Sequence, residues 1–183
     1  EFFHPAHNSL PGRLLAELAA AIQSAGDNDS VRLLVLKSGG DRTFCAGASF
    51  DELAAIEDFA TGKRFFMGFA NVINAIRRCP KFVIGRIQGK AVGGGVGLAA
   101  ATDYCMATKY ASVKLSELAI GIGPFVVGPA VERKLGTSAF ARLANAGAPE
   151  RIAVIPSVSY GIAAVARNLS QESPIRVMAV SGA

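Results

Sequence analysis

Residue types that commonly mark metal sites and disulfide frameworks are scarce in this 183-residue chain. It has only two histidines, His4 and His7, and neither has the spacing of metal ligands. Its three cysteines are an odd number without a CxxC spacing, so they fit neither a zinc site nor a disulfide framework. The sequence therefore predicts no metal site, and reduced thiols in a cytoplasmic compartment are the default expectation.

Long apolar runs are also missing. The longest, residues 118–131, is interrupted by three glycines and two prolines, and a membrane-spanning helix needs about 18–20 apolar residues. We therefore expect no membrane span. Because 51% of the residues are apolar and only 18% are charged, the chain can bury a sizeable core. The positive mean hydropathy of +0.36 favours additional apolar contacts between subunits.

Basic residues outnumber acidic ones, which gives a net charge of +5, but they are dispersed. The short basic clusters at 77–81 and 133–134 have no interleaved aromatic residues, so we expect no nucleic-acid binding. A phosphate-bearing small molecule needs only two or three such charges and stays open as a ligand. No secretory signal is visible, although the chain begins at Glu1 rather than at a methionine, so targeting also stays open.

Apolar periodicity predicts alternating helices and strands. Ser49-Phe50-Asp51-Glu52 has the pattern of a capping box, which predicts that a helix begins directly after Ala48. The other predicted elements are helices over 9–24, 61–78 and from the glycine run to residue 101, and strands over 31–36, 82–87, 104–107 and 112–115. This alternation predicts an α/β fold whose loops carry the chemistry.

Two glycine-centred turns are the most informative local feature. Ala46-Gly47-Ala48 precedes a capped helix, and Gly93-Gly94-Gly95 opens a stretch of good helix formers. Glycine lets a ligand approach the backbone, and the first N–H groups of a helix lack partners and lie at its positive end. Two such turns can direct two N–H groups at one oxygen, as stabilising a thioester enolate requires. The glycine run alone also fits close helix–sheet packing, but it is not a GxGxxG dinucleotide fingerprint.

The order and spacing of several segments resemble the crotonase (enoyl-CoA hydratase/isomerase) superfamily. These segments are 4–10, 44–48, 88–95, 101–103 and 115–124, and the resemblance extends from about His4 to about Gly136. It implies a superhelix of stacked ββα units with a C-terminal helical extension, assembled as a homotrimer or homohexamer. It also implies that the N–H groups of Ala48 and Gly94 form an oxyanion hole, with coenzyme A lying along residues 46–48.

Glu117 is the candidate acid/base. Its apolar neighbours favour partial burial, which would raise the carboxyl pKa and suit it to proton transfer. The resemblance implies two glutamates in a hydratase, and here Gly97 stands at the position of the first. One base suffices to move a double bond, so isomerisation is slightly favoured. Hydration, including that of branched-chain enoyl-CoA, and a non-catalytic acyl-CoA-binding subunit stay open.

The predicted substrate-binding residues are Ala46, Gly47, Ala48, Gly94 and Gly97. Coenzyme A is part of the substrate, so no separate cofactor is expected. The basic residue that the resemblance implies near His4 for a coenzyme A phosphate is missing, and Arg13, Lys37 or a C-terminal basic residue of a neighbouring subunit would replace it.

The sequence divides into a predicted catalytic core and a predicted C-terminal segment. We expect a catalytic core over residues 1–138 and a helical, oligomerising segment over 139–183, with helical composition at 139–148 and 161–168. The resemblance ends before this segment, and the chain is shorter than is usual for the family. Either the protein is truncated or residues are missing from the sequence.

Overall fold

The computed structural model describes residues 1–146, 152–155 and 176–179. Its elements are β1 (Ser9–Leu10), α1 (Gly12–Asp27), β2 (Leu33–Lys37), β3 (Thr43–Cys45), β4 (Gly47–Ala48), α2 (Phe50–Ala54), α3 (Phe59–Arg78), β5 (Phe82–Ile87), β6 (Lys90–Val92), α4 (Gly94–Ala101), β7 (Tyr104–Ala107), β8 (Ser112–Lys114), the 3₁₀ helix η1 (Leu118–Ile120), α5 (Gly128–Leu135), α6 (Thr137–Asn145), β9 (Ile152–Ile155) and β10 (Arg176–Ala179).

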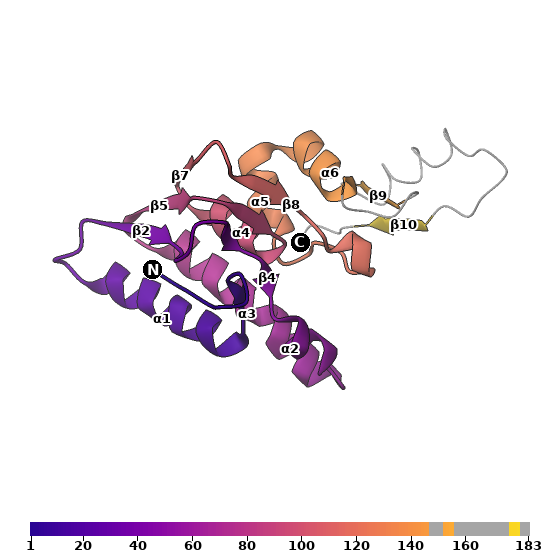
Figure 1. The fold of residues 1–183 in the computed structure, drawn as a ribbon, viewed down its shortest axis with the longest axis horizontal. Helices are drawn as coiled ribbons and strands as arrows, with labels where there is room; N and C mark the ends of the chain where they lie inside the picture. Colours follow the sequence, from indigo (N-terminus) through magenta and orange to yellow (C-terminus); the bar gives the residue numbers. More distant parts are fainter. Residues whose placement is uncertain (147–151, 156–175, 180–183) are drawn as a thin grey trace.

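Two three-stranded parallel sheets form the framework, in the orders β2-β5-β7 (Figure 1) and β3-β6-β8. Along the chain, the six strands of these sheets alternate between the two, and helices follow each pair. Parallel neighbours need such crossover connections. The result is a stack of strand–strand–helix units, which confirms the predicted crotonase-like α/β fold.

Helices α1 and α3 lie beside each other, while α4 lies at the centre of the molecule and contacts both α3 and α5 (Figure 1). Six of the eight residues of α4 are buried, as expected for a helix that is apolar on every side. The first turn of α4 therefore has a fixed position relative to the strands that precede it. No helix in the described ranges combines the length and apolarity needed to cross a bilayer.

The start of α1 differs from the prediction. The sequence pattern predicts the first helix over 9–24, but Ser9 and Leu10 form β1 and pair with Gly47 and Ala48 of β4. Pro11 is the N-cap residue of α1, in an extended conformation. The pairing with a distant glycine loop takes precedence over local helical propensity, and it ties the N-terminal segment to the functional loop.

The start of α3 also differs, by two residues. Asp58 accepts a hydrogen bond from the Thr61 N–H at 2.7 Å, while the Thr61 hydroxyl accepts one from the Asp58 N–H at 3.1 Å. These reciprocal bonds form a capping box that begins the helix at Phe59. Threonine replaces the usual Glu or Gln of this motif, so the sequence pattern does not indicate a capping box here.

The C-terminal segment is only partly helical. Helix α6 confirms helical structure near its start, but Ile152–Ile155 and Arg176–Ala179 form a parallel strand pair. The prediction of a helical segment was therefore wrong at these two strands. In the first of them, Ile152–Ile155, three of the four residues are β-branched, which favours extended backbone. The helix suggested over 161–168 lies outside the described residues.

Candidate active site

The loop of the first glycine turn is held by Asn8. The Ala46 N–H donates to the Asn8 carbonyl oxygen at 3.2 Å, and the Asn8 side-chain amide donates to the carbonyls of Gly39 at 2.8 Å and Thr43 at 2.9 Å. Asn8 is 3% exposed and has a left-handed backbone with φ of 56°. This buried network fixes the path of the chain leaving β3 towards Ala48.

Gly47 brings the two glycine turns together. Its φ is 93°, which favours glycine, and a Cβ added there would lie 3.2 Å from the Val92 carbonyl oxygen and 3.8 Å from the Gly94 nitrogen. The backbone of Ala48 is fixed as well, because its carbonyl oxygen accepts from the Ser9 hydroxyl at 2.9 Å. The structure thus places the two turns side by side, as the oxyanion-hole hypothesis requires.

The second turn ends at the N-terminus of α4. The Gly93 N–H donates to the Lys114 carbonyl oxygen at 2.9 Å, while the Gly93 carbonyl oxygen accepts from the Val96 N–H at 2.9 Å. Gly94 is the first residue of the helix, so its N–H has no intrahelical acceptor. A Cβ on Gly94 would lie 2.5 Å from the ring of Phe69, so only glycine fits under that ring.

A cavity of about 110 Å³ opens beside these turns. Four predicted substrate-binding residues line it together with the predicted base: Ala46, Gly47, Ala48, Gly94 and Glu117. Helices α2 and α3 contribute five apolar side chains to its wall: Phe50, Leu53, Phe65, Phe66 and Phe69. The arrangement combines two backbone turns, one carboxylate and an apolar wall, which are the parts that enolate chemistry on an acyl thioester needs.

Glu117 directly precedes η1, and its side chain lies beside Gly93 of the second glycine turn. One of its oxygens, Oε2, is buried and has no hydrogen-bond partner among the described residues. A Cβ on Gly93 would lie 3.4 Å from the other oxygen, Oε1. Burial raises the pKa of the Glu117 carboxyl, and the nearby backbone N–H groups of Glu117 and Ser116 oppose this shift. A carboxyl with a raised pKa that faces a cavity is suited to proton transfer.

Gly97 does not line this cavity. It lies buried inside α4, where an added Cβ would be 2.6 Å from Val127 Cγ1 and 2.9 Å from Ile73 Cδ1. The structure therefore does not support the prediction that Gly97 contacts substrate. Its position, one helical turn after Gly94, is a packing site whose neighbouring space is filled by Val127.

Introducing a glutamate at Gly97 should destabilise the protein rather than supply a second base. We expect Gly97→Glu to lower the free energy of unfolding by about 3 kcal/mol or more, because overpacking and a buried unpaired carboxylate act together. Urea unfolding checks this. In a double-mutant cycle, Val127→Ala should reduce the cost of Gly97→Ala, since it removes Val127 Cγ1, the atom that lies 2.6 Å from the added Cβ. If the losses of stability caused by Gly97→Ala and Val127→Ala simply add in the double variant, the contact between these two residues would be contradicted.

Cys45 and the two residues predicted to bind a coenzyme A phosphate do not line the cavity. Burial raises the pKa of the Cys45 thiol to about 12, so this residue next to the loop is not a nucleophile at neutral pH. Arg13 and Lys37, predicted to bind a coenzyme A phosphate, form ion pairs with Glu17 at 2.8 Å and Glu1 at 2.9 Å. Neither Arg13 nor Lys37 lines the cavity, so the contact with a coenzyme A phosphate stays a prediction.

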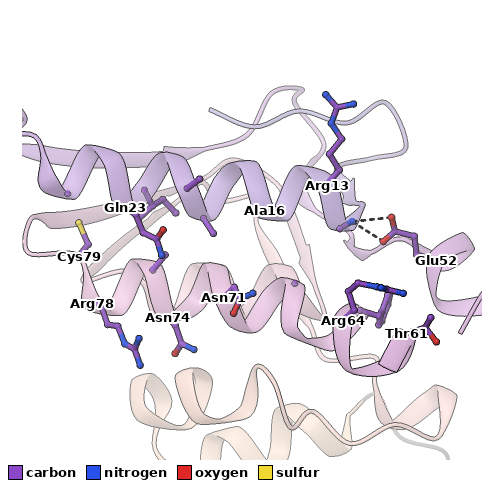
Figure 2. A pocket seen from close by; sticks show the side chains of 18 of the residues that line it. Arg13, Ala16, Gln23, Glu52, Thr61, Arg64, Asn71, Asn74, Arg78 and Cys79 are labelled. Carbon is purple, nitrogen blue, oxygen red and sulfur yellow. Dashed lines mark hydrogen bonds between the residues drawn. The ribbon is translucent and has the colours of Figure 1, made fainter. Parts of the chain in front are cut away.

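A larger groove of about 1010 Å³ lies between α1 and α3 (Figure 2). At one end the Glu52 carboxylate accepts from the Gly12 N–H at 2.8 Å, which ties α2 to the start of α1. Arg64 lies in the N-terminal part of α3 and Arg78 at its C-terminal end, with amide side chains between them (Figure 2). Among the predicted site residues, Arg13 lines this groove, whereas Glu117 and the two glycine turns do not, and we assign the chemistry to the smaller cavity.

Three residues that shape the site were not recognised as such from the sequence. In the sequence Phe69 is one of several apolar residues at helical spacing, a pattern typical of ordinary core, yet its ring covers Gly94. Asn8 lies within the segment 4–10 that carries the family resemblance, and no sequence pattern marks Val127 as a site residue. A local signal existed only for Asn8, because an asparagine tolerates a left-handed backbone better than most residues do.

Comparison with known proteins agrees with this geometry. A family model described as enoyl-CoA hydratase/isomerase matches residues 1–153. An enoyl-CoA hydratase of Alternaria alternata is 32% identical over 137 residues, which are 75% of this chain and 44% of that protein. The mitochondrial methylglutaconyl-CoA hydratase of Rattus norvegicus is 35% identical over 117 residues, which are 64% of this chain and 37% of that protein.

Solved structures give the same result. The enoyl-CoA hydratase of Mycobacterium smegmatis matches with a TM-score of 0.73 and 32% sequence identity, covering 78% of this chain and 55% of that one. This chain therefore spans about half or less of the length of these relatives. Because the family model covers most of the sequence, the chain belongs to the enoyl-CoA hydratase/isomerase family.

Proposed function

We propose that this protein processes enoyl-CoA thioesters by stabilising an enolate in a backbone oxyanion hole, with Glu117 as the single acid/base. The observation that carries the proposal is the Glu117 carboxyl at the same cavity as Ala48 and Gly94, because its Oε2 is buried there without a hydrogen-bond partner in the part of the chain that the structure describes. Each oxyanion donor is typically worth about 3 kcal/mol in the transition state.

Double-bond isomerisation is the reaction that this arrangement suits best. Glu117 removes a proton from C2 of a 3-enoyl thioester, and the electron pair moves onto the thioester oxygen as a dienolate. The N–H groups of Ala48 and Gly94 hold that oxygen while the protonated Glu117 returns the proton to C4. One carboxylate is sufficient for both transfers, and Val127 fills the space beside Gly97 where a second would be needed.

Hydration is the second candidate, since both curated relatives described above are named hydratases. In this reaction Glu117 would activate a water for attack on C3, and the proton would then be delivered to C2. The same oxyanion hole would hold the enolate. Because only one carboxylate lines the cavity among the described residues, this reaction lacks a second group to divide the proton transfers.

Product analysis distinguishes these reactions. Incubation with 3-butenoyl-CoA should produce crotonyl-CoA, seen as a gain of conjugated thioester absorbance, whereas crotonyl-CoA in water should produce little 3-hydroxybutyryl-CoA. Predominant formation of the hydroxy product would favour hydration instead. Saturable binding of acyl-CoA without turnover of either alkene would indicate a non-catalytic acyl-CoA-binding subunit.

We also propose a homotrimeric or homohexameric assembly. The resemblance implies it, and the outward face of the β2-β5-β7 sheet carries half-exposed apolar side chains from Leu33, Val35, Phe82, Tyr104 and Met106. Parallel sheets are usually covered on both faces. Light scattering of the purified protein would measure the mass, and a monomer at micromolar concentration would contradict the assembly.

A further inference from the structure

The charge distribution around the cavity restricts the acyl group it can take. Among the described residues, the side chains lining the cavity include no lysine, arginine or histidine. The polar side chains there are Ser116 and Glu117, and all the others are apolar. The wall therefore offers contacts to hydrocarbon and no positively charged partner for an anion.

We infer that the site is selective for uncharged, apolar acyl groups and discriminates against short acyl groups that end in a carboxylate. This inference rests on the proposed function, because it takes the cavity to be the acyl pocket. The inferred selectivity would differ from that of the rat relative, whose name specifies methylglutaconyl-CoA, a thioester with a second carboxyl group.

Two physical effects act against a carboxylate in this cavity. Phe66, Phe69 and Ile120 would replace the water around it without offering a hydrogen bond, and an unpaired buried charge is strongly unfavourable. The carboxylate would also lie close to Glu117, and like charges a few ångströms apart disfavour the ionised form of both groups. The base would then be protonated more often and would be less able to remove a proton.

Phe66 is the residue best placed to test this selectivity. It lines the cavity from α3 and is 38% exposed, so a lysine at this position can reach both the cavity and water. Phe59 lies on the same helix, is 86% exposed and does not line the cavity. Phe59→Lys therefore adds the same charge to the same helix and controls for attraction between the added lysine and the coenzyme A phosphates.

The experiment measures binding of two saturated, unreactive thioesters, butyryl-CoA and glutaryl-CoA, by calorimetry. We expect butyryl-CoA to bind about 100-fold more tightly. Phe66→Lys should reduce this ratio at least about tenfold by giving the carboxylate a partner, while Phe59→Lys should leave it unchanged. Equal affinities in the unmodified protein would overturn the inference, as would a ratio that Phe66→Lys and Phe59→Lys change alike.

Measurements of turnover distinguish a failure of this inference from a failure of the proposed function. If butyryl-CoA binds selectively but neither crotonyl-CoA nor 3-butenoyl-CoA reacts, the selectivity stands and the proposed reaction is wrong. If crotonyl-CoA and its carboxylated counterpart glutaconyl-CoA react equally well, the reaction stands and the inference is overturned. Absence of binding by both saturated thioesters would overturn both.

Discussion

Replacing Glu117 with glutamine should lower kcat for enoyl-CoA turnover by about 10³-fold, within the range of 10²–10⁴ that general acid–base catalysis contributes. Glutamine keeps the shape of the side chain but cannot accept and return a proton. Affinity for butyryl-CoA should change by less than about threefold, because the acyl chain and the oxyanion donors still make their contacts. Steady-state kinetics and calorimetry check the two halves of this prediction.

The stability of Glu117→Gln distinguishes lost chemistry from lost folding. Burial raises the pKa of Glu117 in the folded state, so the folded protein binds this proton more tightly than the unfolded chain does. The resulting stabilisation is full below the unfolded pKa and is lost as pH rises through the folded pKa. At pH 8 the ionised carboxylate is therefore unfavourable in the folded protein, and the glutamine variant should unfold at the same or a higher temperature.

A matched control is available on the surface. Glu57→Gln removes the same charge at an exposed position outside the cavity and should leave both turnover and affinity unchanged. In the unmodified protein, kcat should fall as pH decreases through the raised pKa of Glu117, because the base must be ionised to accept a proton. Full activity of Glu117→Gln, or a pH profile that it leaves unaltered, would contradict the role of this residue.

Adding one methyl group at Gly94 should produce the other large effect. The Cβ of alanine would lie 2.5 Å from the ring of Phe69, so the ring or the helix N-terminus must move. We expect Gly94→Ala to lower kcat/KM by about 10²–10³-fold, the range seen when one oxyanion donor is lost. The free energy of unfolding should decrease by about 1–3 kcal/mol through overpacking.

Two further variants test this explanation. Gly62→Ala on α3 places its Cβ 3.4 Å from Ile56, an ordinary contact, and should retain both stability and activity. Phe69→Leu combined with Gly94→Ala should recover part of the lost stability, since the smaller side chain makes room for the methyl group. A Gly94→Ala variant with normal kcat/KM would show that the N–H of this residue does not stabilise the transition state.

The elements and the approximate location of the site could be predicted because local patterns determine them. The strand over 82–87 and the helix that begins after Ser49 follow from apolar spacing and a side-chain cap. The two glycine turns could be assigned to one site because each follows a strand and precedes a helix, and because Glu117 follows in the expected order. Local chemistry and chain order were sufficient for these features.

The contacts that refine the site depend on residues far apart in the sequence. Asn8 binds carbonyls 31 and 35 residues away, and no local pattern indicates those partners. Gly97 was assigned to the substrate because of its place in a motif, but its environment is determined by Val127, 30 positions later, and by Ile73 on another helix. Such pairs become visible only when the elements have packed.

The pair formed by Gly97 and Val127 also constrains how this protein could change its reaction over evolutionary time. A carboxylate at residue 97 is obstructed while valine occupies the neighbouring space, so that substitution alone costs stability. A smaller residue at 127 would have to be acquired first, at the cost of a cavity. The order of the two substitutions therefore matters, and each intermediate is less stable than the starting protein. Directed evolution that screens single substitutions would miss this route, whereas a library varying both positions together would include it.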